Sequence, residues 1–484
     1  MSSTPSVLDR YPDYEATIGI EVHVQLMTES KIFCATPNHV PKDPNSHLCI
    51  ICAGYPGVLP VLNKKVVDHA ILTGLATNCT IAEQSRFDRK HYFYPDLPKN
   101  YQITQAYEPI CTKGSIPIRL EDGTIKNIRL TRIHIEEDAG KSIHAEYSNE
   151  SFVDLNRAGT PLLEIVSEPD IANAYEAKTY LKALRSIVQY IGVCTGNMEE
   201  GAFRADTNIS VRKKGAAKLG TRCELKNINS FKFIADAIEY EIERQIELLN
   251  EGGVVRQETR LWAKNKTVTM RSKEEAADYR YFPDPDLPII KIDEAQVNAI
   301  RQLMPELPYQ KFNRFCSQQG LTPYEAEILV DDLDLANYFD ETMRHTPNKQ
   351  VINWILRDVI GYLNEHKITL KEFKVTPEKL AAILDMLGKD TINNHAAKEV
   401  FASVAETGGN PAEIVKEKGL EQIGVSPELE AMIKAIVDNN PGQVAAYKPG
   451  NERIFGFFVG EAMKQTKGKG NPKIIQDLLK KYLQ

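Results

Sequence analysis

Phe203-Arg-Ala-Asp-Thr-Asn-Ile-Ser210 is the stretch that decides the fold of this chain. If it forms a β-strand, its side chains alternate between two faces. Apolar residues then point to one side, and Arg204, Asp206 and Asn208 point to the other. Two interpretations of the polar face stay open. It is either the wet face of an edge strand or the floor of a site for a cation and an anionic ligand.

The segment from Ala16 to Leu26 repeats this alternation. Apolar residues occupy every second position, and Glu21 and His23 lie between them on the opposite face. A carboxylate and an imidazole two positions apart on a strand come within reach of one metal ion. The competing interpretation is a half-exposed first strand whose polar face meets water.

A third polar-faced strand is predicted between Ile128 and Gly140. His134 and Glu136 share one face with an arginine, and Glu137 and Asp138 follow at the strand end. Three successive acids are costly unless a cation or several donors neutralise them. We expect these acids to aim at one point and form part of a site, although a solvated turn would also accommodate them.

Glu224 and Lys226 share the face of a further short strand. The segments 175–191 and 232–250 separate the strands and carry apolar residues at helical spacing, so we interpret them as helices that pack on the core. Strands with one polar face, separated by such helices, predict an α+β domain whose mostly antiparallel sheet presents one functional face.

Three cysteines, Cys34, Cys49 and Cys52, lie close together in the sequence. A single C-x-x-C pair is less than a zinc site normally needs. Cys34 would supply a third thiolate, and His39 or His47 a fourth ligand. The alternative is three reduced, partly buried thiols in a loop.

Two proline-broken loops, Asp88 to Gln102 and Asp278 to Pro288, are dense in Arg and Tyr, and the first also holds Lys and His. Prolines at these positions exclude a regular helix. Loops this rich in donors usually bind a ligand or line a passage. The plain alternative is that Tyr92, Phe93 and Tyr94 cover the core.

The composition changes near Glu294, after which the chain becomes helical, and 408–411 has the sequence of a linker. We therefore expect three domains, at residues 1–293, 294–407 and 408–484. The last segment, 461–484, holds six lysines against two acids, a local charge of +4. Such a patch either contacts phosphates or is an ordinary solvated helix end.

Composition and motifs exclude several classes of protein. The formal net charge of −7 excludes a generally basic nucleic-acid coat. No stretch approaches about 18 apolar residues, so we expect no membrane span. No secretory signal is visible, and the eight scattered cysteines fit a reducing cytoplasm. No P-loop or kinase motif is present, so a site for ATP with magnesium would have to be built from the sheet itself.

The sequence resembles the B-subunit family of tRNA-dependent aspartyl/glutamyl amidotransferases of the GatCAB type, from about Thr17 to the C-terminus. The most specific match is Val153-Asp-Leu-Asn-Arg-Ala-Gly-Thr-Pro-Leu-Leu-Glu-Ile165. The other matching motifs are Ile20-Glu-Val-His-Val24, Phe87-Asp-Arg-Lys90, Tyr92-Phe-Tyr-Pro-Asp96, His134-Ile-Glu-Glu-Asp-Ala-Gly-Lys141, Met198-Glu-Glu-Gly201, Glu224-Leu-Lys-Asn227 and Asp278-Tyr-Arg-Tyr-Phe282.

This resemblance implies a cradle domain with a glutamine-synthetase-like sheet, an all-helical domain and a small helical tail of the YqeY type. It implies a ligase that uses ATP to phosphorylate the side-chain carboxylate of misacylated Glu-tRNA(Gln) or Asp-tRNA(Asn). Ammonia then displaces the phosphate. The ammonia would come from glutamine hydrolysed in a partner A subunit, and a small C subunit would clamp the two together.

The resemblance also implies roles for individual residues. Glu21, His23 and Glu137 would bind magnesium, with Glu136 and Asp138 in support. The expected catalytic residues are Glu21, His23, Lys90, Glu136, Glu137 and Asp206, and Lys90 with the tyrosines around it would form part of the ammonia route. The expected ATP and acyl-end contacts are Asp154, Asn156, Arg204, Asp206, Asn208, Glu224 and Lys226.

One departure from the family pattern bears on the cysteines. Many members have Cys-x-Cys before the Cys-x-x-Cys pair, and Thr36 stands here where the second cysteine would be. Zinc at Cys34, Cys49 and Cys52 is therefore an open expectation.

Two rival functions also remain: a free-standing ATP-dependent carboxylate–amine ligase of glutamine-synthetase-like fold, and a tRNA-binding scaffold without chemistry. The sequence does not distinguish Glu-tRNA(Gln) from Asp-tRNA(Asn) as the substrate.

Overall fold

The structure is a computed structural model that describes residues 6–39, 41–144, 150–272, 278–422, 426–447, 452–466, 468 and 470–483. The chain forms two compact units, Met1–Arg314 and Phe315–Gln484. Helix α5 (Glu294–Arg301) belongs to the first unit, where the Gln296 side chain donates a hydrogen bond to Asp68. The division into three domains at 293/294 and 407/408 stays a prediction.

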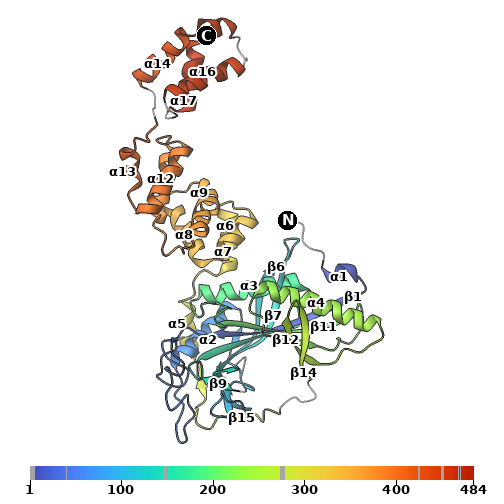
Figure 1. The fold of residues 1–484 in the computed structure, drawn as a ribbon. Helices are drawn as coiled ribbons and strands as arrows, with labels where there is room; N and C mark the ends of the chain where they lie inside the picture. Colours follow the sequence, from blue (N-terminus) through green and yellow to red (C-terminus); the bar gives the residue numbers. More distant parts are fainter. Residues whose placement is uncertain are drawn as a thin grey trace. The chain divides into compact units, whose positions relative to one another are not determined.

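A nine-stranded mixed sheet with β1 at its centre forms the frame of the first unit (Figure 1). Its order is β14 (Lys266–Ser272), β13 (Glu258–Ala263), β12 (Cys223–Lys226), β11 (Phe203–Lys213), β1 (Tyr14–Gln25), β10 (Pro161–Ser167), β7 (Ile125–Glu137), β6 (Cys111–Arg119) and β2 (Thr80–Ile81). Only β12 and β13 run parallel. The predicted polar-faced strands and the mostly antiparallel sheet are confirmed.

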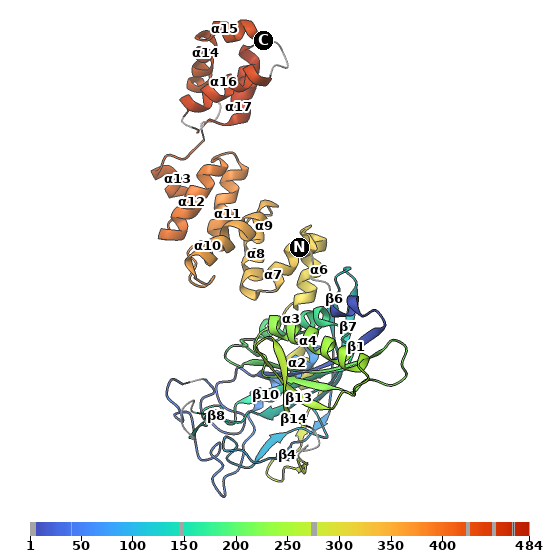
Figure 2. The ribbon, with the colours of Figure 1, turned by 45° about the vertical axis from the view of Figure 1, so that its right-hand side comes forward.

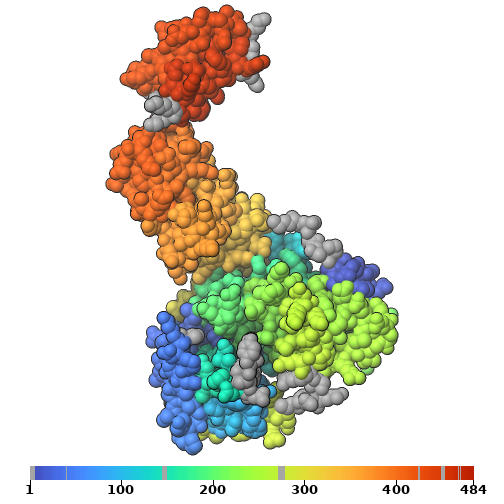
Figure 3. Space-filling model, in the orientation of Figure 1, coloured from blue at the N-terminus to red at the C-terminus, as the bar shows by residue number. Residues whose placement is uncertain are grey.

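One face of the sheet is covered by three helices, α2 (Lys64–Ala76), α3 (Ala174–Tyr190) and α4 (Phe231–Asn250). The last two correspond to the helices predicted from apolar spacing. Ser230 begins α4 as its N-cap, with its hydroxyl accepting a hydrogen bond from the N–H of Phe233. In the space-filling view, green to yellow-green atoms of α3, α4 and neighbouring strands make up much of the visible face of this unit (Figure 3).

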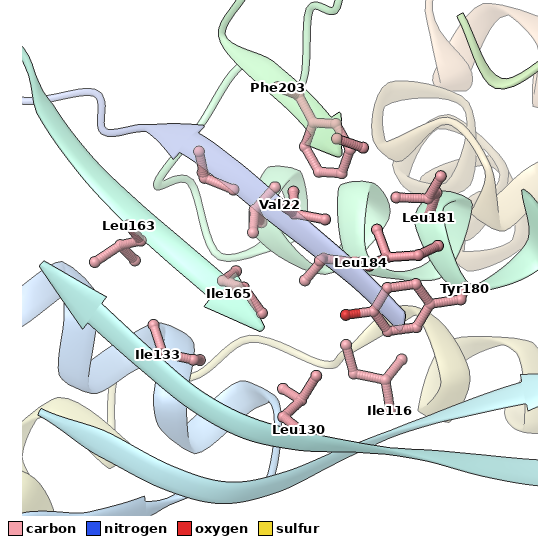
Figure 4. Close-up of a cluster of buried hydrophobic side chains, with 14 of the residues drawn as sticks. Val22, Ile116, Leu130, Ile133, Leu163, Ile165, Tyr180, Leu181, Leu184 and Phe203 are labelled. Atoms are coloured by element: carbon pink, nitrogen blue, oxygen red, sulfur yellow. The ribbon is translucent and has the colours of Figure 1, made fainter. Parts of the chain in front are cut away.

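The apolar face of the sheet and these helices share one core. Val22, Ile133 and Ile165 lie side by side on neighbouring strands, and all three are fully buried. Figure 4 shows these side chains with Tyr180 and Leu184 of α3. Because strand side chains alternate, this burial sends the residues between them to the opposite, polar face.

Small sheets and loops lie on the polar side of the main sheet, away from α3 and α4 (Figures 1 and 2). The strands labelled there are β4 (Asp88–His91), β8 (Lys141–His144), β9 (Ser151–Asp154) and β15 (Phe282–Pro283), and β5 (Tyr101–Thr104) pairs with β4. Two further strands, β3 (Gln84–Ser85) and β16 (Ile290–Lys291), pair with each other. The loop predicted between Asp88 and Gln102 thus begins and ends in strands. A short helix, α1 (Val7–Arg10), precedes β1.

All regular elements after β16 are helical in the described part of the chain, as predicted. They are α5, α6 (Pro308–Gln318), α7 (Pro323–Val330), α8 (Leu333–His345), α9 (Gln350–Trp354), η2 (Ile355–Val359), α10 (Ile360–His366), α11 (Pro377–Gly388), α12 (Asn394–Thr407), α13 (Pro411–Glu417), α14 (Pro427–Asp438), α15 (Pro441–Ala446), α16 (Glu452–Gln465) and α17 (Pro472–Tyr482). No helix among the described residues has the length and apolar character needed to cross a membrane.

The final four helices have a core of their own. Ile433, Phe458, Ile475 and Leu479 are buried together there. Helix α13 packs instead on α11 and α12. A deletion that removes only the tail therefore has to begin after α13.

Leu163→Ala tests the core of the central sheet. Leu163 is fully buried in β10, so we expect a loss of about 2–5 kcal/mol in the free energy of unfolding. Urea unfolding would be followed by the fluorescence of Trp262 in β13, in a Trp354→Phe background, since the chain has two tryptophans. Leu303→Ala, at a side chain 71% exposed, is the matched control and should cost less than about 0.5 kcal/mol. Equal losses would contradict the assigned core.

Candidate functional site

A cavity of about 2220 Å³ opens over the polar face of the sheet. Side chains of β1, β7, β10, β11 and β12 form its floor, and residues of the small sheets and loops form its walls. Most residues predicted for the site line it: Glu21, His23, Lys90, Glu136, Asp154, Asn156, Arg204, Asp206, Glu224 and Lys226. Glu137 and Asn208 are not among the lining residues.

The strand register brings four polar residues into one row across the floor. Arg204 of β11 pairs with His23 of β1, His23 pairs with Glu164 of β10, and Glu164 pairs with His134 of β7. Directly paired residues on neighbouring antiparallel strands have Cβ atoms about 5 Å apart. The register alone therefore brings two imidazoles and a carboxylate together.

Glu136, two residues after His134 on the same face of β7, completes the cluster. His23 Nε2 lies 3.2 Å from Glu136 Oε1 and 3.4 Å from Glu164 Oε2. His134 Nε2 lies 3.3 Å from Glu164 Oε2 and 3.6 Å from Glu136 Oε2. Each carboxylate thus faces both imidazoles. We name Glu136, Glu164, His23 and His134 the central cluster.

In the central cluster, charge pairing has a larger effect on the pKa values than burial has. Burial lowers the pKa of His23, but hydrogen bonds and charge from Glu136 and Glu164 raise it to about 10. The same balance raises the pKa of His134 to about 9. Burial would raise the pKa of Glu136, yet its bonds to His134 and His23 lower it to about 2. In the absence of a metal ion, both imidazoles are therefore protonated and hold the carboxylates ionised.

Three members of the central cluster fit a divalent cation. Nε2 of His23 and carboxylate oxygens of Glu136 and Glu164 lie within 4.8 Å of one another. Two carboxylates and an imidazole are suitable ligands for a hard or borderline ion, with water and substrate oxygens completing the shell. A cation here would replace protons that already balance the negative charge.

The predicted magnesium set of Glu21, His23 and Glu137 is not brought together. Strand β7 continues through Glu137, so Glu136 and Glu137 point to opposite faces. The Glu137 carboxylate binds the Lys99 ammonium and accepts a hydrogen bond of 2.9 Å from the N–H of Ile103. The three successive acids therefore do not aim at one point.

Asp138, the last of those acids, organises a different part of the wall. Its Oδ2 accepts hydrogen bonds from Arg204 at 2.9 Å and from Gln25 at 3.1 Å, and the Arg157 guanidinium lies 3.4 Å away. Asp138 thus fixes two arginines of the cavity without joining the central cluster.

The second polar row of the floor holds Glu21 and an ion-paired lysine. Asn208 donates a hydrogen bond of 3.1 Å to Glu21, and burial with the charges of Glu164 and Glu224 raises the pKa of Glu21. Lys226 donates to Asp206 at 2.5 Å and lies 3.1 Å from Glu224. Glu21 is thus a neighbour of the central cluster, joined to it by charge rather than by a shared ligand position.

Two arginines of the cavity retain unused donors. Nε of Arg132 and Nε of Arg204 are buried and have no hydrogen-bond partner among the described residues. Leaving a buried donor unpaired costs about 1–3 kcal/mol. Both residues line the cavity, and guanidinium groups on the wall of a cavity are typical of a site that receives an anionic ligand.

Lys90 forms part of the wall opposite the floor. Its Nζ lies 4.8 Å from the ring centre of Tyr279 and 5.8 Å from that of Tyr92. Burial lowers its pKa, but the charges of Glu136, Tyr281 and Glu164 outweigh burial and raise it. The ammonium therefore stays charged among aromatic rings, an arrangement that also suits a small cation or amine.

Asp154 and Asn156, expected as ATP contacts, bind another loop of the protein. Asp154 Oδ1 accepts a hydrogen bond of 3.1 Å from the N–H of Asn45, and Asn156 Oδ1 accepts one of 2.8 Å from the N–H of His47. The amide group of Asn156 donates to the carbonyl oxygen of Asp43 at 2.9 Å. Both side chains line the cavity, but their polar atoms hold residues 43–47 in place.

The three cysteines come together, while the predicted fourth ligands do not. Sulfur atoms of Cys34, Cys49 and Cys52 lie within 4.8 Å of one another, and this group contains neither His39 nor His47. The Thr36 hydroxyl lies 4.0 Å from Cys52 Sγ, and the Lys31 ammonium 3.8 Å from it. A structural zinc site takes four ligands, and the three sulfurs gathered here do not fit such a site.

Glu164 and the pairing of His134 with Glu136 and Glu164 were missed from the sequence. Glu164 is the single acid in the apolar run Pro161-Leu-Leu-Glu-Ile-Val-Ser167. A charged residue in the middle of an apolar strand is costly to bury unless it is paired. This cost of burial was the signal in the sequence that could have identified Glu164 as a site residue. It indicates Glu164 more strongly than it indicates the three successive acids at 136–138.

The cavity thus combines carboxylates and imidazoles placed for a metal ion with arginines placed for an anion. This combination is typical of enzymes that act on phosphorylated or carboxylate substrates with a divalent cation.

Comparison with known proteins defines the family. Residues 16–298 match the model of the GatB/GatE catalytic domain, and residues 337–483 match the GatB domain model that carries the YqeY name. The chain is 52% identical to the B subunit of the aspartyl/glutamyl-tRNA(Asn/Gln) amidotransferase of Geotalea daltonii, over 98% of this chain and 100% of the relative. It is 49% identical to the B subunit of the same amidotransferase from Chlorobium phaeobacteroides, over 97% and 99%. The chain belongs to the family of B subunits of tRNA-dependent amidotransferases, which are ligases.

Divalent-ion binding at the central cluster should depend on pH. A bound ion has to displace the proton of His23, whose pKa is raised to about 10, so affinity should rise with pH. With Mn²⁺ as the probe, calorimetry should show the apparent Kd falling about tenfold per pH unit between about pH 6.5 and 8.5 for release of one proton.

Two matched variants locate this ion. Glu164→Gln should weaken Mn²⁺ binding at least about tenfold, whereas Glu137→Gln removes a charge from the other face of β7 and should leave binding nearly unchanged. The opposite ranking would restore the set of Glu21, His23 and Glu137.

Proposed function

We propose that this chain uses ATP to phosphorylate the side-chain carboxylate of misacylated Glu-tRNA(Gln), Asp-tRNA(Asn) or both, and converts the acyl phosphate to the amide with ammonia. The observation that carries the proposal is the central cluster beside Arg132 and Arg204, two arginines that line the same cavity. Phosphoryl transfer needs cationic groups around the transferred phosphate and a fixed acceptor, and these residues supply such groups.

His23, Glu136 and Glu164 would hold a magnesium ion. When bound, magnesium would supply positive charge that offsets the negative charge developing in phosphoryl transfer. His134 would keep Glu136 and Glu164 ionised and oriented from the side. Glu21 would contribute negative charge next to this position and orient Asn208, with which it is hydrogen-bonded.

The arginines and Lys226 would bind the anionic groups. Arg204 is held by Asp138 through a hydrogen bond of 2.9 Å, so its guanidinium is oriented before a phosphate arrives. Lys226 is balanced by Asp206 and Glu224, which fixes its ammonium on the floor. We propose that these groups contact ATP and the acyl end, on a sheet used as in glutamine synthetase.

Ammonia would have to come from another chain. The sequence lacks an amidase Ser-Ser-Lys pattern and a Cys–His nucleophile pair, so glutamine hydrolysis is assigned to an A subunit, with a small C subunit joining the two. Lys90 with Tyr92, Tyr279 and Tyr281 would form the last part of the ammonia route. The alternatives, a free-standing ligase and a scaffold without chemistry, find no support among the relatives named above.

Glu164→Gln should abolish the first chemical step. The variant keeps the volume of the side chain but removes charge that His23, His134 and the metal ion need. We expect amide formation by the assembled enzyme to fall on the order of a hundredfold or more, measured with radiolabelled misacylated tRNA and ATP.

Added ammonium should not rescue Glu164→Gln, because the defect precedes the entry of ammonia. Rescue by ammonium would move Glu164 from phosphoryl transfer to the ammonia route. Phosphorylated acyl-tRNA formed at the native rate would refute the metal role.

The tail should contribute to tRNA binding. Lys464, Lys473, Lys480 and Lys481 are described, and Lys481 is paired with Glu430, while Lys467 and Lys469 lie outside the described residues. Because α13 packs on α11 and α12, the deletion should begin at Ser426.

Removing residues 426–484 should raise the KM for tRNA about tenfold, reduce the dependence of binding on salt, and leave ATP binding unchanged. The combined Lys464→Gln, Lys473→Gln and Lys480→Gln variant is the control that keeps the tail folded. Unchanged tRNA affinity and salt slope in both would show that the lysines are only a solvated surface.

A further inference from the structure

We propose that Cys49 and Cys52 form a reversible dithiol–disulfide pair that couples the oxidation state of this loop to the wall of the cavity. Its functional readout rests on the proposed function above, whereas the formation of the disulfide does not.

The two sulfur atoms are already close to bonding distance. Cys49 Sγ and Cys52 Sγ are 3.7 Å apart, and a disulfide needs about 2.05 Å. The backbone between them is a tight turn in which the N–H of Ala53 donates to the carbonyl oxygen of Cys49 at 2.9 Å. Closing the bond requires the two sulfur atoms to approach each other by about 1.7 Å.

Cys52 is placed to react as the thiolate. The N–H of Cys49 donates to Cys52 Sγ at 3.2 Å, and the Lys31 ammonium lies 3.8 Å from that sulfur. Lys31 is 1% exposed, so its charge acts in a medium where few water molecules screen it. A positive charge and an amide donor stabilise a thiolate, which is the nucleophilic form of cysteine.

The same surroundings disfavour a structural zinc ion. Such a site takes four ligands, and the group of donor atoms here contains three sulfurs. Thr36 offers a hydroxyl where a fourth thiolate would be needed, and the Lys31 ammonium lies where it would repel a second cation. Thiols that are gathered but not held by a metal ion remain free to react with one another.

The oxidation step balances with a peroxide as the oxidant. The Cys52 thiolate attacks one peroxide oxygen, the O–O bond breaks, and hydroxide leaves and takes up a proton to become water. The resulting sulfenic acid is attacked by the Cys49 sulfur, which releases a second water and forms the S–S bond. Two thiols and one peroxide thus give one disulfide and two waters, and a thiol reductant reverses the change.

Lys31 links this reaction to the cavity. Its ammonium donates hydrogen bonds to the carbonyl oxygens of His47 at 2.8 Å and Ala158 at 2.7 Å, besides facing Cys52. Ala158 follows Arg157, which lines the cavity, and the N–H of His47 is bound by Asn156. Disulfide formation removes the negative charge of the Cys52 sulfur, which faces the buried Lys31 ammonium. Lys31 then loses one of its partners, and we expect the position of residues 154–158, to which it is hydrogen-bonded, to change.

The experiment uses the assembled amidotransferase. The untreated enzyme should contain less than one zinc per complex by elemental analysis. Stoichiometric hydrogen peroxide should produce a Cys49–Cys52 disulfide in peptide mass spectra, and amide formation should fall severalfold and return with dithiothreitol. Cys316→Ser, at a cysteine of the other compact unit, should behave like the parent, while Cys49→Ser should form no disulfide at this turn and keep its activity in peroxide.

Each opposite outcome overturns the proposal. One firmly bound zinc per chain, or thiols that stay unoxidised in peroxide, would show a metal or an inert site instead. A disulfide that forms without changing amide formation would remove the coupling to the cavity. If the untreated enzyme makes no amide at all, the proposed function fails, while the mass spectra still decide whether the dithiol pair exists.

Discussion

The pairing of β1 with β10 on one side and β11 on the other is the constraint on which the site depends. It fixes His23 opposite both Glu164 and Arg204. A slip by one residue would send His23 into the core and an apolar residue to the cavity. The register is held by the opposite face, where Val22 and its neighbours are fully buried against the helices. The hydrophobic core therefore positions the polar site without any polar residue choosing the register.

Concentrating four titratable groups on a sheet is costly unless their charges cancel. In the central cluster, two carboxylates and two imidazoles alternate, so each group has a neighbour of opposite charge. Removing one partner from such a buried set of charges lowers the free energy of unfolding by more than the intact set contributes to it. The protons on His23 and His134 thus stabilise a site that a divalent ion would also neutralise. The carboxylates of Glu136 and Glu164 therefore determine both the stability of the metal-free site and the affinity of the site for a divalent ion.

The alternation of each strand was predictable from the sequence, but the lateral arrangement of the strands was not. Period two assigned Glu21, His23 and Arg204 to the polar face correctly, because burial of their neighbours leaves no other choice. It could not say that β10 lies next to β1, since pairing partners far apart in sequence leave no local signal. Glu164 was therefore overlooked. Glu137 was grouped with Glu21 and His23 because β7 was expected to end before it. The strand in fact includes Glu137, so the Glu137 side chain points to the opposite face from Glu136.

Asp154 and Asn156 show why a residue in a specific motif need not touch a ligand. Their side chains lie in the cavity wall, yet their oxygens accept hydrogen bonds from the backbone of residues 45–47. Loops have few internal contacts and need partners for their backbone groups. Asp154 at the end of β9 and Asn156 just after it supply those partners, and Lys31 donates two more hydrogen bonds, to the carbonyl oxygens of His47 and Ala158. Residues 43–52 and 154–158 are therefore joined by hydrogen bonds into one part of the cavity wall. Arg157, within the second of these loops, lies 3.4 Å from the Asp138 carboxylate, which also accepts a hydrogen bond from Arg204. The loops are thus connected to the cavity through Asp138, without direct contact with substrate.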